Sequence, residues 1–159
     1  MKLTIERAAL LKSLGHVQSI VERRNTIPIL SNVKFAADDQ ALHLNATDMD
    51  LDIVEQVAAN VSTPGAITVP AHTLYEIVRK LPEGAQVNID GDGEGQIILS
   101  AGRSRFTLAS LSVDEFPVLS GGDLPHQFVL KAAELRGLID RTRFAISTEE
   151  TRYYLNGIY

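Results

Sequence analysis

The acidic residues whose spacing could bind a metal ion or transfer protons are Asp48, Asp50 and Asp52. They alternate with apolar residues over 48–53, which is the pattern of a half-buried strand, so the three carboxylates are expected side by side on its solvated face. No nearby cluster of His, Glu or Asp completes a coordination set for a metal ion. We therefore favour a solvated strand face over a metal or acid–base site.

A second acidic stretch, Asp90 to Gly95, has acids at positions 1, 3 and 5 and glycine at position 6, as in a calcium-binding EF-hand loop. Position 12 is Ala101, so the bidentate carboxylate of that loop is missing. The flanking segments have the pattern of strands rather than helices. We interpret the stretch as a hairpin turn.

Other catalytic chemistry has little support in the sequence. The chain has no cysteine, which excludes disulfides, thiolate nucleophiles and Cys-ligated metal sites, and which suits a reducing cytoplasm. Phosphate-binding glycine loops and the H-E-x-x-H and G-x-S-x-G motifs are absent. The histidines are scattered, at His16, His43, His72 and His126. We expect no cofactor, no metal ion and no enzymatic activity.

The length and composition indicate a globular protein. With 159 residues, 45% of them hydrophobic, the chain can bury one sizeable core. It has no run of about 18 apolar residues that could span a membrane, and its N-terminus lacks the apolar core of a signal peptide. We expect a soluble, cytoplasmic protein.

The elements that position the candidate side chains follow a strand-then-helix pattern that occurs three times. The copies begin at Thr4, Thr68 and Val129, and aligning them without gaps also aligns their apolar residues. In the first copy the hydrophobic period changes from two to that of a helix, whose apolar face extends over 10–21. Repetition at a long period indicates that one supersecondary unit has been copied.

The repeats predict an α+β fold. Each unit consists of a strand, a helix and three further strands, with the helices on one face of antiparallel sheets. Two complete units, 1–61 and 65–111, form a first domain over 1–120. Residues 121–126 are expected to link this domain to the start of an incomplete second domain at 127–159.

The net charge of −5 argues against a nucleic-acid partner, but its distribution argues for one. The helical windows 8–24, 71–81 and 131–143 hold nine of the 15 basic residues and four of the 20 acidic ones. The candidate nucleic-acid contacts on these helices are Lys12, Lys80 and Arg141. Helix surfaces often carry Lys and Arg, so merely solvated faces are an equally open interpretation.

Arg23 and Arg24 follow the first helix, and Pro28 forces an extended path after them. Cations at a helix end favour the helix dipole, but two adjacent guanidinium groups could equally bind phosphates. Further along, the periodicity is lost over 111–125, which is typical of a linker.

Two stretches combine arginine with apolar or aromatic residues. In the strand predicted over 103–109, Phe106 and Leu108 share one face and two arginines the other, which suits an ordinary strand or an edge that pairs with another subunit. The stretch 151–157 is expected to begin a strand. Its arginine and two tyrosines suit contacts with bases or backbone, or half-buried strand positions.

Four motifs occur together in one known family. They are Arg24 followed by Ile27-Pro28-Ile29-Leu30, Thr47-Asp48, Gly102-Arg103-Ser104-Arg105-Phe106, and Arg152-Tyr153-Tyr154-Leu155-Asn156-Gly157. On these residues, and over all 159 positions, the chain resembles the bacterial sliding clamps, the beta subunits of DNA polymerase III. The resemblance implies the DNA-clamp fold, in which two crescent-shaped subunits of three domains each form a ring. Helices line the central hole of that ring and sheets form its rim.

The resemblance also implies roles for individual residues. The implied DNA contacts are Arg24, Tyr153 and Tyr154. The implied subunit interface contains Arg103, Arg105, Phe106 and Leu108. The implied pocket for polymerase and clamp-loader peptides contains Arg152 and Leu155. The chain departs from the family pattern at an acidic pair, Glu149 and Glu150, and at His72 and Thr73, which replace a basic pair.

The leading hypothesis is a homodimeric processivity clamp that encircles duplex DNA, with weak, salt-sensitive and sequence-independent contacts. Its partners would be double-stranded DNA, DNA polymerase III and the clamp loader. The alternative is a repeat-built protein-interaction scaffold that never binds nucleic acid, and an enzyme with scattered carboxylates is a weaker third. The clamp hypothesis requires the basic helix faces to line one concave surface. The family chains are more than twice as long, so this sequence is expected to stop inside its second domain.

Overall fold

The computed structural model describes residues 1–22, 26–91, 95–117, 126, 128–147, 149–155 and 157, apart from the side chains of Glu150 and Tyr153. The chain divides into two compact units, Met1–Leu119 and Ser120–Tyr159. Within the described residues, all strands belong to the first unit.

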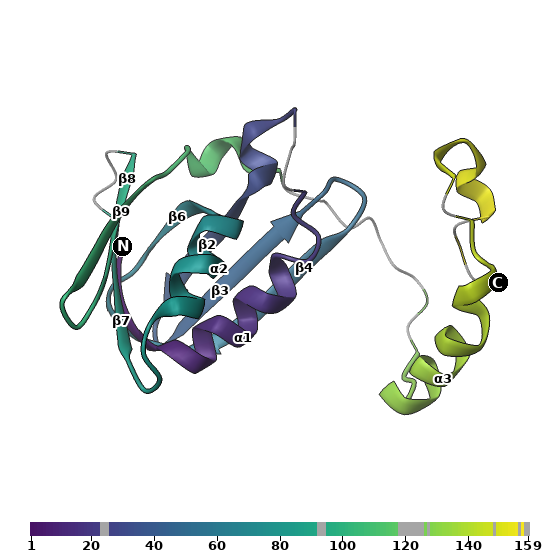
Figure 1. Cartoon of the computed structure of the whole chain (residues 1–159), viewed down its shortest axis with the longest axis horizontal. Coiled ribbons are helices and arrows are strands. Elements are labelled where there is room, and N and C mark those ends of the chain that lie inside the picture. Colours follow the sequence, from purple (N-terminus) through teal and green to yellow (C-terminus); the bar gives the residue numbers. More distant parts are fainter. Residues whose placement is uncertain are drawn as a thin grey trace. The chain divides into compact units, whose positions relative to one another are not determined.

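The first unit contains both complete repeats (Figure 1). The first repeat consists of β1 (Lys2–Glu6), α1 (Arg7–Val17), β2 (Asn32–Asp38), β3 (Ala41–Thr47), β4 (Asp52–Ala58) and β5 (Asn60–Thr63), with a 3-10 helix at Pro28–Ser31 before β2. The second repeat consists of β6 (Gly65–Pro70), α2 (Ala71–Lys80), β7 (Gln86–Gly91), β8 (Gln96–Ala101) and β9 (Ser104–Ala109). The predicted α+β class with antiparallel sheets is confirmed.

The two repeats exchange their first strands. One sheet has the order β5-β1-β7-β8-β9 and the other the order β4-β3-β2-β6. Strand β1 therefore pairs with β7 of the second repeat, while β6 pairs with β2 of the first. Because each sheet needs strands from both repeats, neither repeat can complete a sheet alone.

Both helices and both sheets contribute to one hydrophobic core. Leu10 and Leu14 of α1, Val78 of α2 and Phe35 of β2 are completely buried. Burying one such side chain contributes about 1.5–3 kcal/mol. Figure 1 shows α1 and α2 side by side, with α1 across β3 and β4, which it contacts. The outer faces of both helices are exposed within the described part of the first unit.

The predicted strand over 48–53 is wrong in its first half. The Asp48 carboxylate accepts hydrogen bonds from the backbone N–H groups of Asp50 and Leu51 at 3.0 and 2.7 Å, and Met49 has a φ of 82°. These bonds close a turn, which acidic and amide side chains favour. Strand β4 begins only at Asp52, so the three carboxylates do not line one strand face.

The predicted start of a strand over 151–157 is also wrong for 151–155, while residue 156 lies outside the described part of the chain. The structure has 3-10 turns over Glu150–Leu155, with Arg152 at φ −117° and ψ 44° between them. A strand needs a hydrogen-bonding partner, and the described part of the second unit offers none.

Three further predictions near element ends are revised. Helix α1 ends at Val17, although Val21 is still 96% buried and packs into the core. Part of the predicted linker, 111–117, belongs to the first unit, because Phe116 is buried against Ile29 and Leu30. The predicted turn after Asp90 includes 92–94, which lie outside the described residues, but β7 and β8 do pair as a hairpin.

Candidate nucleic-acid interface

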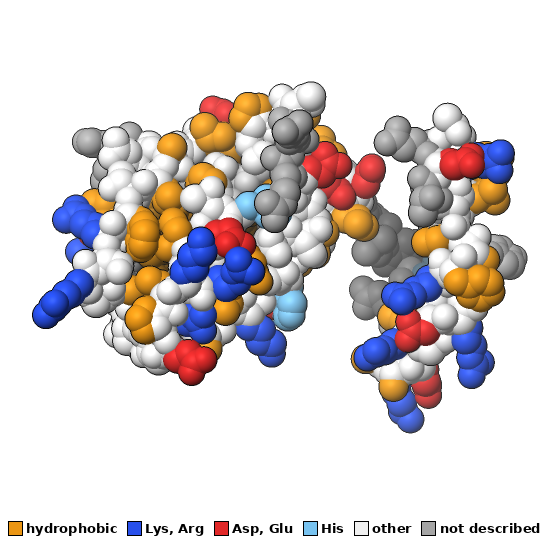
Figure 2. Space-filling model, viewed as in Figure 1, with side chains coloured by type: hydrophobic (Ala, Val, Ile, Leu, Met, Phe, Trp, Pro, Cys, Tyr) orange, Lys and Arg blue, Asp and Glu red, His pale blue; other side chains and the backbone are white. Residues whose placement is uncertain are grey.

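Two lysines on the first-unit helices are exposed and have no partner among the described residues. Lys12 lies on α1 and Lys80 is the last residue of α2. By contrast, a terminal nitrogen of the neighbouring Arg79 lies 2.7 Å from the Glu76 carboxylate. Figure 2 shows Lys and Arg side chains over the face that α1 and α2 cover, interspersed with acidic ones. The unpaired cations leave positive charge available to a polyanion.

The placement of α2 beside α1 depends on Arg7, the first residue of α1. Its Nε donates to the carbonyl of Val78 at 3.0 Å, and a terminal nitrogen donates to the carbonyl of Arg79 at 2.6 Å. These carbonyls belong to the last turn of α2, where the helix dipole favours a cation. The partners are more than 70 residues apart in the chain, so no local pattern could have predicted this contact.

His72 forms a second link, at the opposite ends of the two helices. Its Nε2 donates to the carbonyl of Val21 at 2.7 Å, and its Nδ1 lies 2.9 Å from Oε1 of Gln18. With Arg7, this link holds α1 and α2 antiparallel. The His72 that replaces a basic residue of the family pattern is therefore a structural link between helices. Arg24, the predicted DNA contact beyond Val21, lies outside the described residues.

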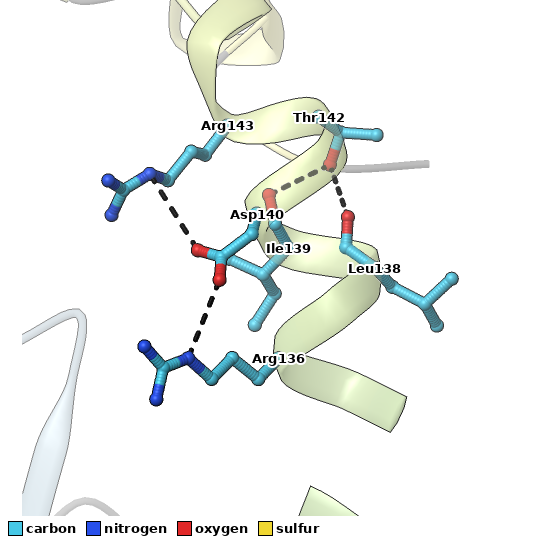
Figure 3. Close-up of polar contacts among 6 residues, drawn as sticks. All are labelled: Arg136, Leu138, Ile139, Asp140, Thr142 and Arg143. Atoms are coloured by element: carbon cyan, nitrogen blue, oxygen red, sulfur yellow. Dashed lines mark hydrogen bonds and ion pairs between the residues drawn. The ribbon is translucent and has the colours of Figure 1, made fainter. Parts of the chain in front are cut away.

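In the second unit, α3 (Ala132–Thr142) carries Arg136 and Arg141, and Arg143 follows as its C-cap. Arg141 is exposed and has no hydrogen bond or ion pair with any described residue. Arg136 and Arg143 instead share one carboxylate, that of Asp140, with Nε–O distances of 3.4 and 3.9 Å (Figure 3). Helix α3 and its C-cap therefore combine one unpaired cation, Arg141, with two that are partly neutralised.

A hollow of about 550 Å³ in the second unit brings together the two predicted peptide-pocket residues, Arg152 and Leu155. Its other lining residues are Thr142, Ala145, Ile146, Ser147, Tyr154 and Gly157. Nε of Arg152 lies 3.0 Å from the carboxylate of Glu149, so this acidic departure from the family pattern has a partner within the chain. A guanidinium beside apolar surface suits a short peptide segment. The side chain of Tyr153, a predicted DNA contact, lies outside the described part of the chain, whereas that of Tyr154 is 70% exposed.

The predicted subunit interface lies at a sheet edge. Among the described strands, β9 pairs only with β8, and Arg105 on it is exposed and unpaired in the same part of the chain. Phe106 and Leu108 are half-buried and pack against the core. Arg103 lies in the turn before β9 rather than in the strand, and is also exposed. The free edge and its two arginines could accept another chain.

A groove of about 550 Å³ runs between α2 and Phe106. Its apolar lining is supplied by Ile77, Leu81 and Pro82, and its charged lining by Glu76 and Lys80. Figure 2 shows hydrophobic side chains between α2 and β9 on this face. Sequence spacing alone could not assign Ile77, Leu81 and Pro82 to a groove, because it fits the apolar face of a helix and its end equally well.

The described residues show few signs of other chemistry. No group of three or more His, Cys, Asp or Glu among them could hold a metal ion. No helix in the same residues is long and apolar enough to cross a membrane. The pKa of the Glu6 carboxyl group is lowered, because the backbone N–H groups of Ala8 and Ala9 bond its carboxylate. That carboxylate caps α1, which is a structural role.

Comparison with known proteins adds a family. The sequence model of one protein family, described as DNA polymerase III beta subunit, N-terminal domain, matches residues 1–120. A beta sliding clamp of Caulobacter vibrioides is 59% identical over 160 residues, covering 100% of this chain and 43% of that protein. The crystal structure of the DNA polymerase sliding clamp from Caulobacter crescentus is 59% identical, with a TM-score of 0.95 over 100% of this chain and 43% of that chain. The sliding clamp of Bartonella birtlesii bound to griselimycin is 48% identical, with a TM-score of 0.96 over 100% and 42%. The chain thus spans about 43% of the length of the curated relatives that it matches.

Proposed function

The chain belongs to the family of DNA polymerase III beta subunits, and from this premise we propose that it acts as part of a sliding clamp. The clamp encircles duplex DNA in the cytoplasm and tethers the replicative polymerase for processive synthesis. Its action is mechanical, because a closed ring stays on DNA without tight or sequence-specific contacts. No catalytic step is part of the proposal.

The observation that carries the proposal is the pair of unpaired lysines on adjacent, antiparallel helices. Lys12 and Lys80 lie on outer faces that the core leaves free, while Arg79 beside Lys80 is already paired. Exposed cations that gain nothing from an intramolecular partner are suited to phosphate groups. Contacts of this kind depend on salt and not on base sequence.

We assign the DNA contacts to both units. They are Lys12, Arg24 and Lys80 in the first unit, and Arg141, Tyr153 and Tyr154 in the second. The exposed ring of Tyr154 suits stacking or sugar contacts. Arg24 and Tyr153 are assigned from the family resemblance alone.

We assign the homodimer interface to the edge of the five-stranded sheet. Arg103, Arg105, Phe106 and Leu108 supply it, and the groove beside α2 extends it with Ile77 and Leu81. An apolar centre with charged neighbours is the usual anatomy of such an interface. Arg152 and Leu155 are assigned to the pocket for peptides of the polymerase and the clamp loader.

The proposal is tested by equilibrium binding of the natural polypeptide to two unrelated linear duplexes over a salt series. We expect Lys12→Gln, Lys80→Gln and Arg24→Ala each to weaken binding by about 1 kcal/mol or less, equally for both duplexes. Each should also make the salt dependence less steep, by about 0.9 in log–log slope for a lost phosphate contact. Arg79→Gln is the matched control, because it removes the same charge from a paired residue.

Two outcomes would reject the assignment. If the three substitutions leave affinity and slope unchanged while the wild type binds DNA, these residues are not contacts. If the wild type binds neither duplex, the scaffold that never meets nucleic acid becomes the better function.

A further inference from the structure

The carboxylate of Asp140 on α3 lies near the guanidinium groups of two arginines. Nε of Arg136 lies 3.4 Å from Oδ2 of Asp140, and Nε of Arg143 lies 3.9 Å from Oδ1 of the same residue. The spacings of four and three residues put the three side chains along one stripe of the helix. Figure 3 shows both arginines on one side of α3 and Leu138 on the other.

Each guanidinium uses only its Nε in this arrangement. The group has five N–H donors, and Figure 3 shows the terminal nitrogens of both arginines directed away from the carboxylate. The side chains of Arg136 and Arg143 are 84% and 70% exposed, against 50% for Asp140. Two outward-facing donor pairs, separated by one negative charge, are therefore presented to solvent.

The ligand chemistry of such a stripe is that of phosphodiester groups. Paired terminal nitrogens of a guanidinium match the oxygens of a phosphate, as they match those of a carboxylate. A carboxylate between them repels the same phosphates and cancels one of the two positive charges. An ion pair between side chains this exposed does little to fix the arginines in place. Asp140 therefore affects anion binding mainly through its negative charge.

We propose that Asp140 limits the grip of α3 on the DNA backbone by neutralising one of two arginines at the place where phosphates bind. The inference rests on the proposed function, because only a protein that must move along DNA has use for a weakened phosphate contact. Asp140 is a tuning residue in this scheme, and Arg136 and Arg143 are the contacts that it tempers. Arg141, one residue further along, makes its contact independently.

The test compares two substitutions that remove one negative charge from the same helix. Asp140→Asn keeps the shape of the side chain and releases both arginines. Glu134→Gln is the matched control, because the Glu134 side chain makes no hydrogen bond or ion pair with any described residue. Binding of the natural polypeptide to a short linear duplex is measured by fluorescence anisotropy over a salt series, with circular dichroism to confirm that the helix content is unchanged.

We expect Asp140→Asn to tighten binding about two- to five-fold, as removal of one exposed charge near phosphates should, and to steepen the salt dependence. Glu134→Gln should have a clearly smaller effect. In a background with Arg136→Gln and Arg143→Gln, Asp140→Asn should give no more gain than the control.

Every other result overturns the inference. Equal gains from Asp140→Asn and Glu134→Gln would mean that only net charge matters. Weaker binding by Asp140→Asn would mean that the carboxylate organises the arginines for binding. If the wild type binds with the expected salt dependence and Asp140→Asn changes nothing, only this inference fails. If the wild type binds no DNA, the proposed function fails with it.

Discussion

The cations of this chain fall into two kinds: some bond within the fold, and others remain exposed to solvent. Arg7 donates to two carbonyls at the end of α2, and a charged donor in such a position contributes about 1.5–3 kcal/mol per hydrogen bond when it leaves no buried group unpaired. An exposed ion pair contributes about 0–1 kcal/mol. Leaving Lys12 and Lys80 without partners therefore costs the fold little, and it keeps their charge available for a ligand.

Glu6 gives a prediction about acid stability. The pKa of its carboxyl group is below the ordinary value of 4.5, because it accepts hydrogen bonds from the backbone of Ala8 and Ala9 at the start of α1. A depressed pKa stabilises the folded state above the ordinary pKa, and this contribution is lost as the pH falls through the folded-state pKa. We expect Glu6→Gln to lower the free energy of unfolding near neutral pH, with the difference from wild type shrinking in acid.

The measurement is urea unfolding of both proteins between about pH 7 and pH 3. Glu83→Gln is a suitable control, because Glu83 is exposed and has no described contact. A difference between Glu6→Gln and wild type that stays constant over the whole range would show that the cap does not depend on ionisation.

Among the elements, the helices and most strands could be predicted from sequence, but their pairing could not. The change of hydrophobic period identifies α1 and α2 because their buried residues recur at helical spacing. The hydrophobic period does not indicate that β1 pairs with β7 of the other repeat. Strand β5 was missed because its four residues are short of apolar side chains, and it is held by pairing with β1.

The turn at Asp48 illustrates a second limit. Alternating polar and apolar residues fit a strand, but two backbone N–H groups bonded to one carboxylate decide for a turn. The groove beside α2 shows a third limit, since Ile77 and Phe106 come from different elements and only packing brings them together. Candidate residues on a single helix or strand could thus be predicted, whereas sites formed by residues from several elements could not.

The edge formed by β9 and α2 gives a prediction at this scale. Phe106 lies in the groove between them, and aromatic residues at interface centres contribute a large part of the binding energy. We expect Phe106→Ala to weaken self-association of the natural polypeptide at least about ten-fold while the first unit stays folded. Sedimentation equilibrium at micromolar concentrations measures the effect, and thermal unfolding checks the fold.

Thr107→Ala is the matched control, because Thr107 is the next residue on β9 and its side chain is exposed. The interface assignment is rejected if Phe106→Ala associates as strongly as wild type, or if Thr107→Ala weakens association by the same factor.

In the whole molecule, the two units differ in how they bury apolar surface. The first unit has a core to which both sheets and both helices contribute. In the second unit, large apolar side chains are exposed in the segment before α3, on the helix itself and after it. They include Phe128, Val129, Leu130, Leu135, Leu138, Ile139, Phe144 and Ile146.

This difference predicts which part of the chain folds by itself. A chain of residues 1–117 retains both repeats, the exchanged strands and the buried Phe116, and its size is enough for an independent core. Of the described elements, a chain of residues 126–159 retains α3 and the 3-10 turns, and an isolated helix of 11 residues is marginal in water. We expect cooperative urea unfolding for the first fragment and none for the second.

In the 159-residue chain, trypsin should cut first after Arg136, Arg141 or Arg143, leaving the first unit resistant. A first fragment without a cooperative transition, or initial cleavage inside 1–117, would show that the exchanged repeats need further chain to be stable.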